Sequence, residues 1–294
     1  MAEGTEDQMP ITGPIVVATD FSTRSDRALR RATIIARQSG AALVLAHVVD
    51  DDQPRHLVDH QLAASRAILD ETVETIERMD GIAARAQLLA GDVFSGILQI
   101  ADDVAAGLVV VGPHRRQLRD VFMGTTAERT IAHSRRPVLM TAGVPSAPYD
   151  RVLVALDLDQ ASRAAAPLVQ ELELVDRAEI VAMHAFEVPG QGMMRRAMVE
   201  PDLILDSVAD AQTEAQSDFD ALLADIGLTG ARKITMPAHG SPGRRILESA
   251  RDEGASLIVV GTSQRTGIER FMLGSIAETV LGDADRDVLV VPAR

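Results

Sequence analysis

The sequence predicts an α/β protein made of two tandem domains, each a doubly wound five-stranded parallel sheet. Three observations predict this class. Short apolar runs alternate with amphipathic segments, the runs are apolar at nearly every position, and the same landmarks occur twice along the chain. Strands that are apolar throughout are typical of parallel sheets buried on both faces. Because crossovers between parallel strands are right-handed, helices then cover both faces of each sheet.

The elements of the first half follow from the periodicity of its apolar residues. Strands are expected at residues 15–19, 42–49, 82–89, 108–111 and 136–141. Between them, a helix with apolar residues at a 3.6-residue period starts near Thr23 and closes at Gly40, where a glycine commonly follows a helix. Further helices are expected at 56–79, at 94–106 and directly after Gly124.

The second half repeats this order at a nearly constant offset. Asp157 matches Asp20, and His184 matches His47, 137 residues later in both cases. By the fourth strand the offset is 149, so 12 extra residues fall between the second and fourth strands, and we assign much of the excess to residues 187–202. A length of 294 residues suits domains at 1–143 and 150–294, joined by a linker at 144–149 that is rich in Pro, Ser and Ala.

Composition excludes several functional classes. The chain has no Cys, which excludes disulfides, thiolate metal sites and thiol catalysis. Its net charge of −14 argues against nonspecific nucleic-acid or anionic-lipid binding, and an aromatic content of 2% leaves no platform for stacking bases. The acidic start is no signal peptide, and no apolar run is long enough to cross a membrane, so we expect a cytoplasmic protein.

Two cassettes carry the most chemistry, one at residues 108–140 and one at 257–291. Each begins with a buried strand that runs to a glycine, Gly112 or Gly261, followed by a basic loop. A glycine and a hydroxyl residue then open a helix, and the spacing of Thr125 to Glu128 and of Ser275 to Glu278 predicts a capping box in both copies. Such a turn is either a plain helix cap or a site for phosphate, because free N–H groups meet the helix dipole there.

These cassettes, with the strand openings IVVATDFS and VLVALDLD, resemble the universal stress protein family over essentially the whole chain. The resemblance implies strand order 3-2-1-4-5 in each domain and a pseudo-two-fold relation between the domains. Nucleotide-binding members carry G-x2-G-x9-G-S/T. Here Arg115 replaces the second glycine in a loop one residue short, and Gln264 replaces it in a loop of full length.

The resemblance also implies a nucleotide site at the carboxyl ends of the strands. Its candidate residues in the first domain are Thr19, Asp20, Val48, Gly112, His114, Arg115, Gly124, Thr125 and Thr126. In the second domain they are Leu156, Asp157, Gly261, Gln264, Arg265, Gly274, Ser275 and Ile276. Several alternatives stay open: the two aspartates either contact ribose or form turns, and Arg115 either replaces lost phosphate contacts or fills the pocket. The histidines of the second strands are expected to be core or strand-end residues, because the seven His show no ligand spacing.

The function implied is a stress-response regulator that binds ATP or ADP, with Mg, in at least one domain. The alternative is a nucleotide-free interaction scaffold that acts on an unknown protein partner. No nucleophile–base pair or Walker motif is present, so an enzyme is not expected. Slow ATP hydrolysis or autophosphorylation at Ser275 or Thr125 is a third reading. The final strands of the two domains are expected to pair within the chain, and a homodimer stays open.

Overall fold

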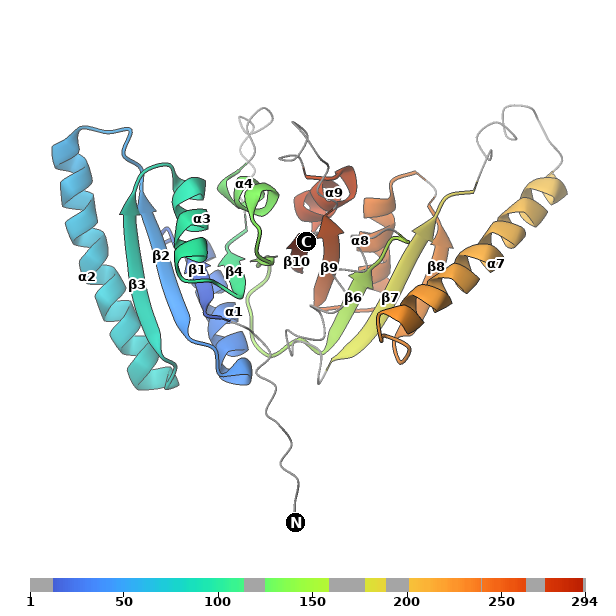
Figure 1. The fold of residues 1–294 in the computed structure, drawn as a ribbon, viewed down its shortest axis with the longest axis horizontal. Coiled ribbons are helices and arrows are strands. Elements are labelled where there is room, and N and C mark those ends of the chain that lie inside the picture. Colours follow the sequence, from blue (N-terminus) through green and yellow to red (C-terminus); the bar gives the residue numbers. More distant parts are fainter. Residues whose placement is uncertain are drawn as a thin grey trace, which may run out of the picture. The chain divides into compact units, whose positions relative to one another are not determined.

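The computed structural model describes residues 13–113, 125–158, 178–188, 201–238, 240–262 and 273–292. These residues form two compact units, one on each side of the bond between Pro148 and Tyr149, called unit 1 and unit 2 below. Each is an α/β fold in which helices cover a parallel sheet (Figure 1).

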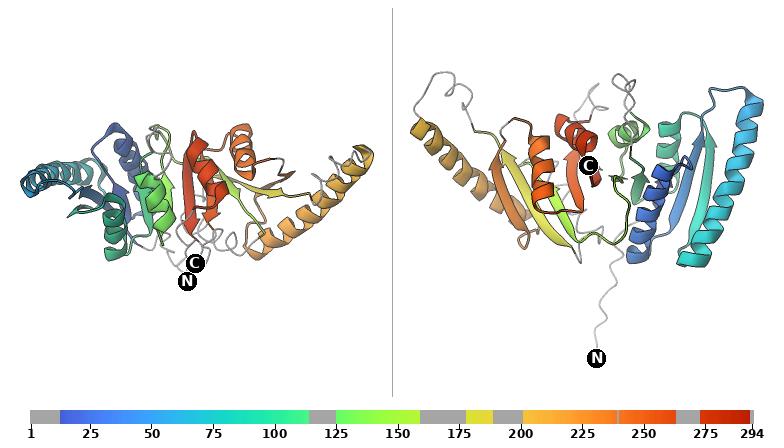
Figure 2. Two further views of the ribbon diagram at one scale, coloured as in Figure 1. Left: turned by 90° about the horizontal axis from the view of Figure 1, so that it is seen from above. Right: turned by 180° about the vertical axis from the view of Figure 1, so that it is seen from behind.

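Unit 1 contains five parallel strands in the order β3-β2-β1-β4-β5. The strands are β1 (Ile15–Ala18), β2 (Leu43–Val49), β3 (Ala84–Ala90), β4 (Leu108–Val111) and β5 (Val138–Met140). The helices are α1 (Thr23–Ser39), α2 (Arg55–Asp80), α3 (Val93–Asp103) and α4 (Thr126–His133). Figure 2 shows α1 and α2 on one face of this sheet and α3 and α4 on the other, as right-handed crossovers require.

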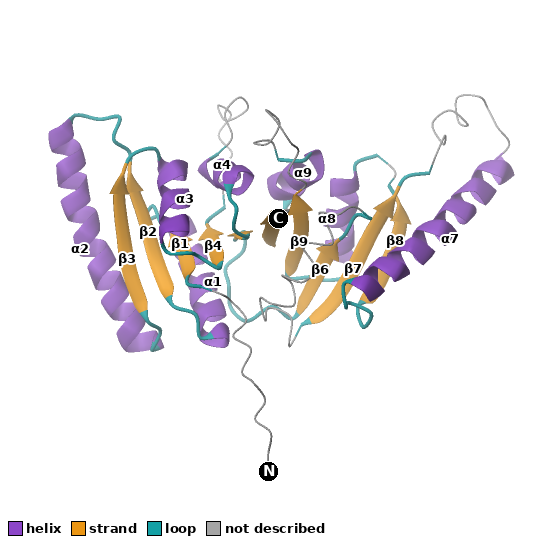
Figure 3. Cartoon of the chain, in the orientation of Figure 1, coloured by secondary structure: helices purple, strands orange, loops and turns teal. Residues whose placement is uncertain are grey.

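Unit 2 repeats the order as β8-β7-β6-β9-β10, again parallel throughout. Its strands are β6 (Arg151–Ala155), β7 (Glu179–Phe186), β8 (Arg232–Pro237), β9 (Leu257–Thr262) and β10 (Asp287–Pro292). The described helices are α7 (Pro201–Asp225), α8 (Pro242–Asp252) and α9 (Ser275–Asp283), drawn in purple in Figure 3. The expected order 3-2-1-4-5 is therefore confirmed in both units.

The cores are aliphatic and centred on the strands. Every residue of β4 is buried, and the three central residues of β6 have no exposed surface. The edge strand β3 starts at Ala84, two residues later than the apolar run at 82 suggested, because Ile82 is buried ahead of the first residue that pairs with β2. The helix expected at 94–106 ends at Asp103, because Ala105 takes a positive φ of 49° that no α-helix continues through.

Most of the extra length of unit 2 precedes its long helix. α2 begins six residues after the end of β2, at Arg55, whereas α7 begins fifteen residues after the end of β7, at Pro201. The expectation that much of the 12-residue excess lies within residues 187–202 is therefore confirmed. None of the helices in the described ranges is both long enough and apolar enough to cross a bilayer.

The segment after β5 is anchored to unit 1. Arg27 and Arg31 of α1 donate hydrogen bonds from their Nη1 atoms to the carbonyl oxygens of Ala142 (3.3 Å) and Ala147 (2.8 Å). On the other side of the junction, the Tyr149 hydroxyl donates to Asp287 Oδ2 of β10 at 2.7 Å, and both residues are buried.

Candidate functional site

The carboxyl ends of β1 and β4 in unit 1, and of β6 and β9 in unit 2, form the switch points of the two sheets. At each, two directly paired strands are followed by connections to strands on opposite sides of the pair in the sheet order, and ligands of doubly wound sheets bind at such a point. Thr19 and Asp20 follow β1, and Gly112 follows β4. Leu156 and Asp157 follow β6 in the same way.

The loop after β1 is closed by its own hydrogen bonds. Thr19 Oγ1 accepts from the Phe21 N–H at 3.1 Å, and Asp20 Oδ1 accepts from the Ser22 N–H at 3.0 Å and the Ser22 hydroxyl at 2.5 Å. Ser22, not Asp20, is the N-cap of α1 and accepts from the N–H of Ser25. Asp20 is thus a turn residue in this structure.

The electrostatics of this loop follow from those bonds. Partial burial raises the pKa of the Asp20 carboxyl, but hydrogen bonds from Ser22 and Ser25 lower it by more, so the pKa lies below its ordinary value. Phe21 adopts φ of 58°, a left-handed conformation that is uncommon for a residue with a bulky side chain. The sequence reasoning did not single out Phe21. The Asp-x-Ser triplet at residues 20–22, a turn-forming pattern, was the available signal.

The two second-strand histidines serve the same structural purpose. His47 Nδ1 lies 2.8 Å from the Thr19 carbonyl oxygen, and His184 Nδ1 lies 3.0 Å from that of Leu156, so each ring bonds the chain just after the first strand. His184 is buried, and each histidine lies two residues before the end of its strand, within the expectation of core or strand-end residues. Among the described residues, no group of three or more His, Asp or Glu is arranged to hold a metal ion.

What covers each histidine differs between the units. In unit 1 the ring of Phe21 packs on His47 with a centroid distance of 4.3 Å. In unit 2 the ring of Phe219, on α7, stacks on His184 at 5.6 Å. The residue of unit 2 that matches Phe21 is therefore not needed to cover the histidine. That residue, Leu158, is 37% exposed and follows the carboxyl end of β6.

Packing explains why the chain places a glycine after β4. A Cβ atom on Gly112 would lie 3.0 Å from the Arg24 carbonyl oxygen and 3.3 Å from the Ser25 nitrogen. The first turn of α1 therefore lies against the end of β4, and any side chain would push it away. Close approach of backbone to backbone, independent of any ligand, requires glycine here.

The two cassette helices begin differently. In unit 1 the predicted capping box is confirmed, because Thr125 Oγ1 accepts from the Glu128 N–H at 3.3 Å and Glu128 Oε2 accepts from the Thr125 N–H at 2.9 Å. The capping box predicted for Ser275 and Glu278 is wrong. There Gly274 is the N-cap, no side chain of the described residues caps α9, and Ser275 is already its first residue. A hydroxyl inside the helix cannot reach the N–H three residues on, as an N-cap hydroxyl does.

The surroundings of these helix starts also differ. In unit 1 Arg129 of α4 lies over the Phe94 ring, with its Cζ 3.7 Å from the ring centroid, and 3.5 Å from Asp92 Oδ2 at the start of α3. In unit 2 Gly243 stands where Phe94 stands, and a Cβ there would lie 2.7 Å from Thr279 Cβ. Helix α8 therefore approaches α9 without an intervening ring or cation.

The remaining candidate residues are placed as follows. Val48 is buried on β2, and Thr126 and Ile276 lie in the first turns of α4 and α9. Gly261 lies in β9, paired with Val291. The candidates His114, Arg115, Gly124, Gln264 and Arg265 lie outside the described residues.

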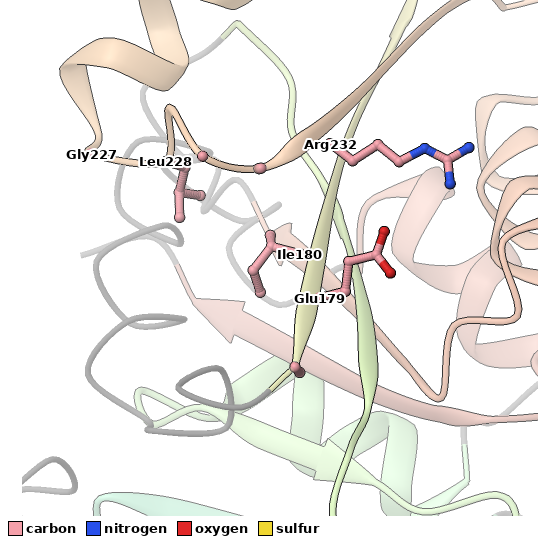
Figure 4. Close-up of a pocket in the computed structure, with 8 residues that line it drawn as sticks. Glu179, Ile180, Gly227, Leu228 and Arg232 are labelled. Atoms are coloured by element: carbon pink, nitrogen blue, oxygen red, sulfur yellow. The ribbon is translucent and has the colours of Figure 1, made fainter.

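A hollow of about 470 Å³ lies elsewhere in unit 2, at the amino ends of β7 and β8 (Figure 4). Ile180 and Leu228 form its apolar wall. Its charged wall is already neutralised, since Glu179 pairs with Arg151 and Arg232 pairs with Glu253, both at 2.7 Å. This hollow lies at the amino ends of the strands, whereas the candidate site lies at their carboxyl ends, so the hollow is no part of the site.

Comparison with known proteins identifies relatives of both halves. The universal stress protein family model matches residues 12–142 and 148–292. A universal stress protein of Methanocaldococcus jannaschii, MJ0531, is 32% identical over 145 residues, which cover 49% of this chain and 82% of that protein. A universal stress protein of Mycolicibacterium smegmatis is 24% identical and aligns over 95% of this chain and 97% of its own length.

The solved structures agree on the fold. The crystal structure of a universal stress protein from Archaeoglobus fulgidus has a TM-score of 0.72 at 19% identity and covers 96% of both chains. A Pseudomonas aeruginosa protein of unknown function, PA1789, has a TM-score of 0.68 at 20% identity. With the family model matching both halves in succession, the chain belongs to the universal stress protein family, in its tandem two-domain form.

Proposed function

We propose that this protein is a stress-response regulator that binds an adenine nucleotide, ATP or ADP, and that unit 2 holds the tighter site. The observation that carries the proposal is the uncapped start of α9 at the switch point of unit 2. Nucleotide phosphates bind where free main-chain N–H groups and the positive end of a helix dipole coincide.

The described residues leave the start of α9 open to a ligand. A Cβ atom on Gly274 would meet no described atom within 4 Å, and the Ser275 side chain is exposed. Within the described ranges, no side chain accepts a hydrogen bond from the first N–H groups of this helix. A phosphate would satisfy these donors and accept from the Ser275 hydroxyl, giving charge-assisted bonds that the described residues do not make.

The start of α4 in unit 1 is less suited to an anion. The Glu128 carboxylate already bonds the Thr125 N–H, so this donor is not available to a phosphate. The nearby Arg129 is engaged by Asp92 and Phe94. Because both helices carry a glutamate in the first turn, the difference lies in the cap, and unit 1 offers fewer free donors to a phosphate.

The nucleoside would lie at the end of β6. The exposed Asp157 follows that strand and can accept from ribose hydroxyls, and the exposed Leu158 offers apolar surface to the base. Any Mg²⁺ would be held mainly by the phosphates, since Mg²⁺ commonly binds through substrate phosphates and one or two carboxylates. The described residues contain no cluster that would bind it unaided.

Calorimetric titration of the purified full-length chain with ATP and with ADP tests this proposal. Ser275→Glu places a carboxylate at the phosphate position and should abolish binding in unit 2. Thr125→Glu is the matched control and should leave the tighter binding event intact. Loss of binding only in Thr125→Glu would reverse the assignment of the two units.

A nucleotide-free scaffold is the second candidate function. It is favoured for unit 1, because the loops there are held by hydrogen bonds among their own residues. Asp20 Oδ1 accepts two hydrogen bonds from Ser22, and Thr125 is bonded to Glu128, so both side chains are held without a ligand. Absence of heat and of any thermal shift when the wild type is mixed with millimolar ATP or ADP would support the scaffold for the whole chain.

A further inference from the structure

One buried hydroxyl group of unit 2 is bonded to sulfur. Ser249 of α8 is buried, and its hydroxyl donates to the thioether sulfur of Met236 on β8 at 3.7 Å. Other helix hydroxyls of this chain, such as those of Ser39 and Thr130, donate instead to the carbonyl oxygen four residues back. Because a thioether is a weak acceptor, the buried hydroxyl of Ser249 has a poorer partner than these.

The side chain of Met236 faces α8 from the edge of the sheet. β8 is the edge strand of unit 2, and side chains alternate between the two faces of a strand. Lys233 pairs with Asp220 of α7, whereas Arg232 pairs with Glu253, directly after α8. Met236 lies on the same face as Arg232 and is only half-buried. It therefore packs on α8 at a place that small solutes in water can reach.

Unit 1 has two hydrocarbon side chains at the matching positions. Met236 and Leu89 each follow the residue that pairs with the second-strand histidine of their unit. Ser249 and Ile100 are each the eighth residue of the helix that follows, α8 or α3. Unit 2 therefore has a thioether and a hydroxyl where unit 1 has Leu and Ile. A thioether can be oxidised under conditions that leave these hydrocarbons unchanged.

Oxidation of Met236 needs only hydrogen peroxide. The chain has no cysteine, so methionine is its readily oxidised sulfur. A sulfur lone pair attacks one oxygen of the peroxide, the S–O bond forms as the O–O bond breaks, and the other oxygen leaves as water after taking up a proton. The sulfur loses two electrons and the peroxide gains them. The product, methionine sulfoxide, is polar, and it disrupts a packed contact unless its oxygen finds a donor.

The Ser249 hydroxyl is such a donor and is already in place. A sulfoxide oxygen that accepts from it along a lone-pair direction, with an O···O distance of about 2.8 Å, leaves the sulfur and the hydroxyl oxygen roughly as far apart as the 3.7 Å observed. The flexible methionine side chain can turn the new oxygen toward Ser249. We propose that Met236 is a reversible oxidation site for hydrogen peroxide, at which the Ser249 hydroxyl binds the sulfoxide oxygen. The site does not depend on nucleotide binding.

The other described methionines serve as references for the rate of oxidation. Met79 is 70% exposed and should react first, whereas Met140 and Met183 are buried and should react last. Met236 should react at a rate between these. Treatment of the native full-length chain with hydrogen peroxide, followed by digestion and mass spectrometry at successive times, gives a rate for each residue. A Met236 that reacts as slowly as Met183 would overturn the site.

The part played by Ser249 is tested by urea unfolding before and after treatment with peroxide, with a transition fitted for each unit. Met236→Leu gives the shift of the unit 2 midpoint that all other methionines cause. Relative to that reference, oxidation should leave the midpoint of wild type unchanged or raise it, and should lower that of Ser249→Ala. Equal shifts in wild type and Ser249→Ala would overturn the part assigned to Ser249. Far-UV circular dichroism confirms that each variant is folded before oxidation.

Leu89→Met is the matched control in unit 1, because it places a thioether where the matching helix residue, Ile100, offers no donor. Its oxidation should lower the midpoint of unit 1, a comparison that holds even where Ser249→Ala fails to fold. An unchanged midpoint would show that no donor is needed and would overturn the proposal. Methionine sulfoxide reductases acting on both epimers should return oxidised wild type to its original mass at Met236. Persistence of that sulfoxide in the folded chain would exclude reversibility.

Discussion

Substitution of Gly96 by Ala should destabilise the protein when residue 48 is Val and stabilise it when residue 48 is Ala. Gly96 lies in the first turn and a half of α3, over the end of β2. A Cβ atom there would lie 2.7 Å and 2.8 Å from the two γ-methyl groups of Val48. Distances below 3.0 Å require a shift, and the buried, β-branched valine has little freedom to rotate.

The magnitudes follow from two opposing effects. Overpacking of a core typically costs about 1–3 kcal/mol, whereas Gly to Ala in a helix gains about 1 kcal/mol. Gly96→Ala alone should therefore lower the free energy of unfolding by up to about 2 kcal/mol. Val48→Ala alone costs about 1.6 kcal/mol for two buried methyl-sized groups. In that background the nearest remaining atom is Val48 Cβ, at 3.4 Å, an ordinary contact. Gly96→Ala should then stabilise the protein by about 1 kcal/mol.

Urea unfolding followed by far-UV circular dichroism measures all four proteins of this double-mutant cycle. The two units have separate cores, so the curves are fitted with a transition for each. An interaction energy of about 1–3 kcal/mol between the two substitutions is expected, equal to the relieved overpacking. Equal destabilisation by Gly96→Ala in both backgrounds would refute the close packing of α3 on Val48.

Three further predictions concern the cap, the first loop and the domain junction. Thr125→Ala should destabilise unit 1 by about 1 kcal/mol, whereas Ser275→Ala should change the stability of unit 2 by no more than about 0.5 kcal/mol. The reason is that Thr125 caps its helix and Ser275 does not. Thermal unfolding of both variants measures the difference. The pKa of Asp20 is lowered in the folded state, so its stabilisation is present above the unfolded pKa of about 4 and lost as pH falls through the folded value. Wild type and Asp20→Asn should therefore differ in stability at pH 7 and converge below about pH 4; a constant difference across that range would contradict the assignment. Tyr149→Phe removes one buried hydrogen bond to Asp287 and should lower the free energy of unfolding of unit 2 by about 1 kcal/mol. The same urea assay measures it. A loss of stability confined to the transition of unit 1 would contradict the placing of Tyr149 in unit 2.

Periodicity and repetition were enough to predict the architecture. Strands such as 108–111 are apolar at every position. A strand that is buried on both faces needs this pattern, so it can be recognised without knowing which elements pack against it. The capping box at Thr125 is likewise local, because its two hydrogen bonds join residues three apart. The start of the edge strand was misplaced, because Ile82 is buried without belonging to the strand, so burial and strand pairing begin at different residues.

Only the tertiary structure decided how the two copies differ. Identical Gly-Ser/Thr-x-x-Glu patterns gave a closed cap in α4 and an open one in α9, because the helix in unit 2 starts one residue earlier. The choice between Phe21 and Phe219 as the cover of a histidine joins residues far apart in sequence, which no local pattern encodes. The need for glycine at 112 arises from the first turn of α1, some ninety residues away. Local hydrogen bonding and burial are written in adjacent residues, whereas contacts between distant elements exist only once the chain has folded.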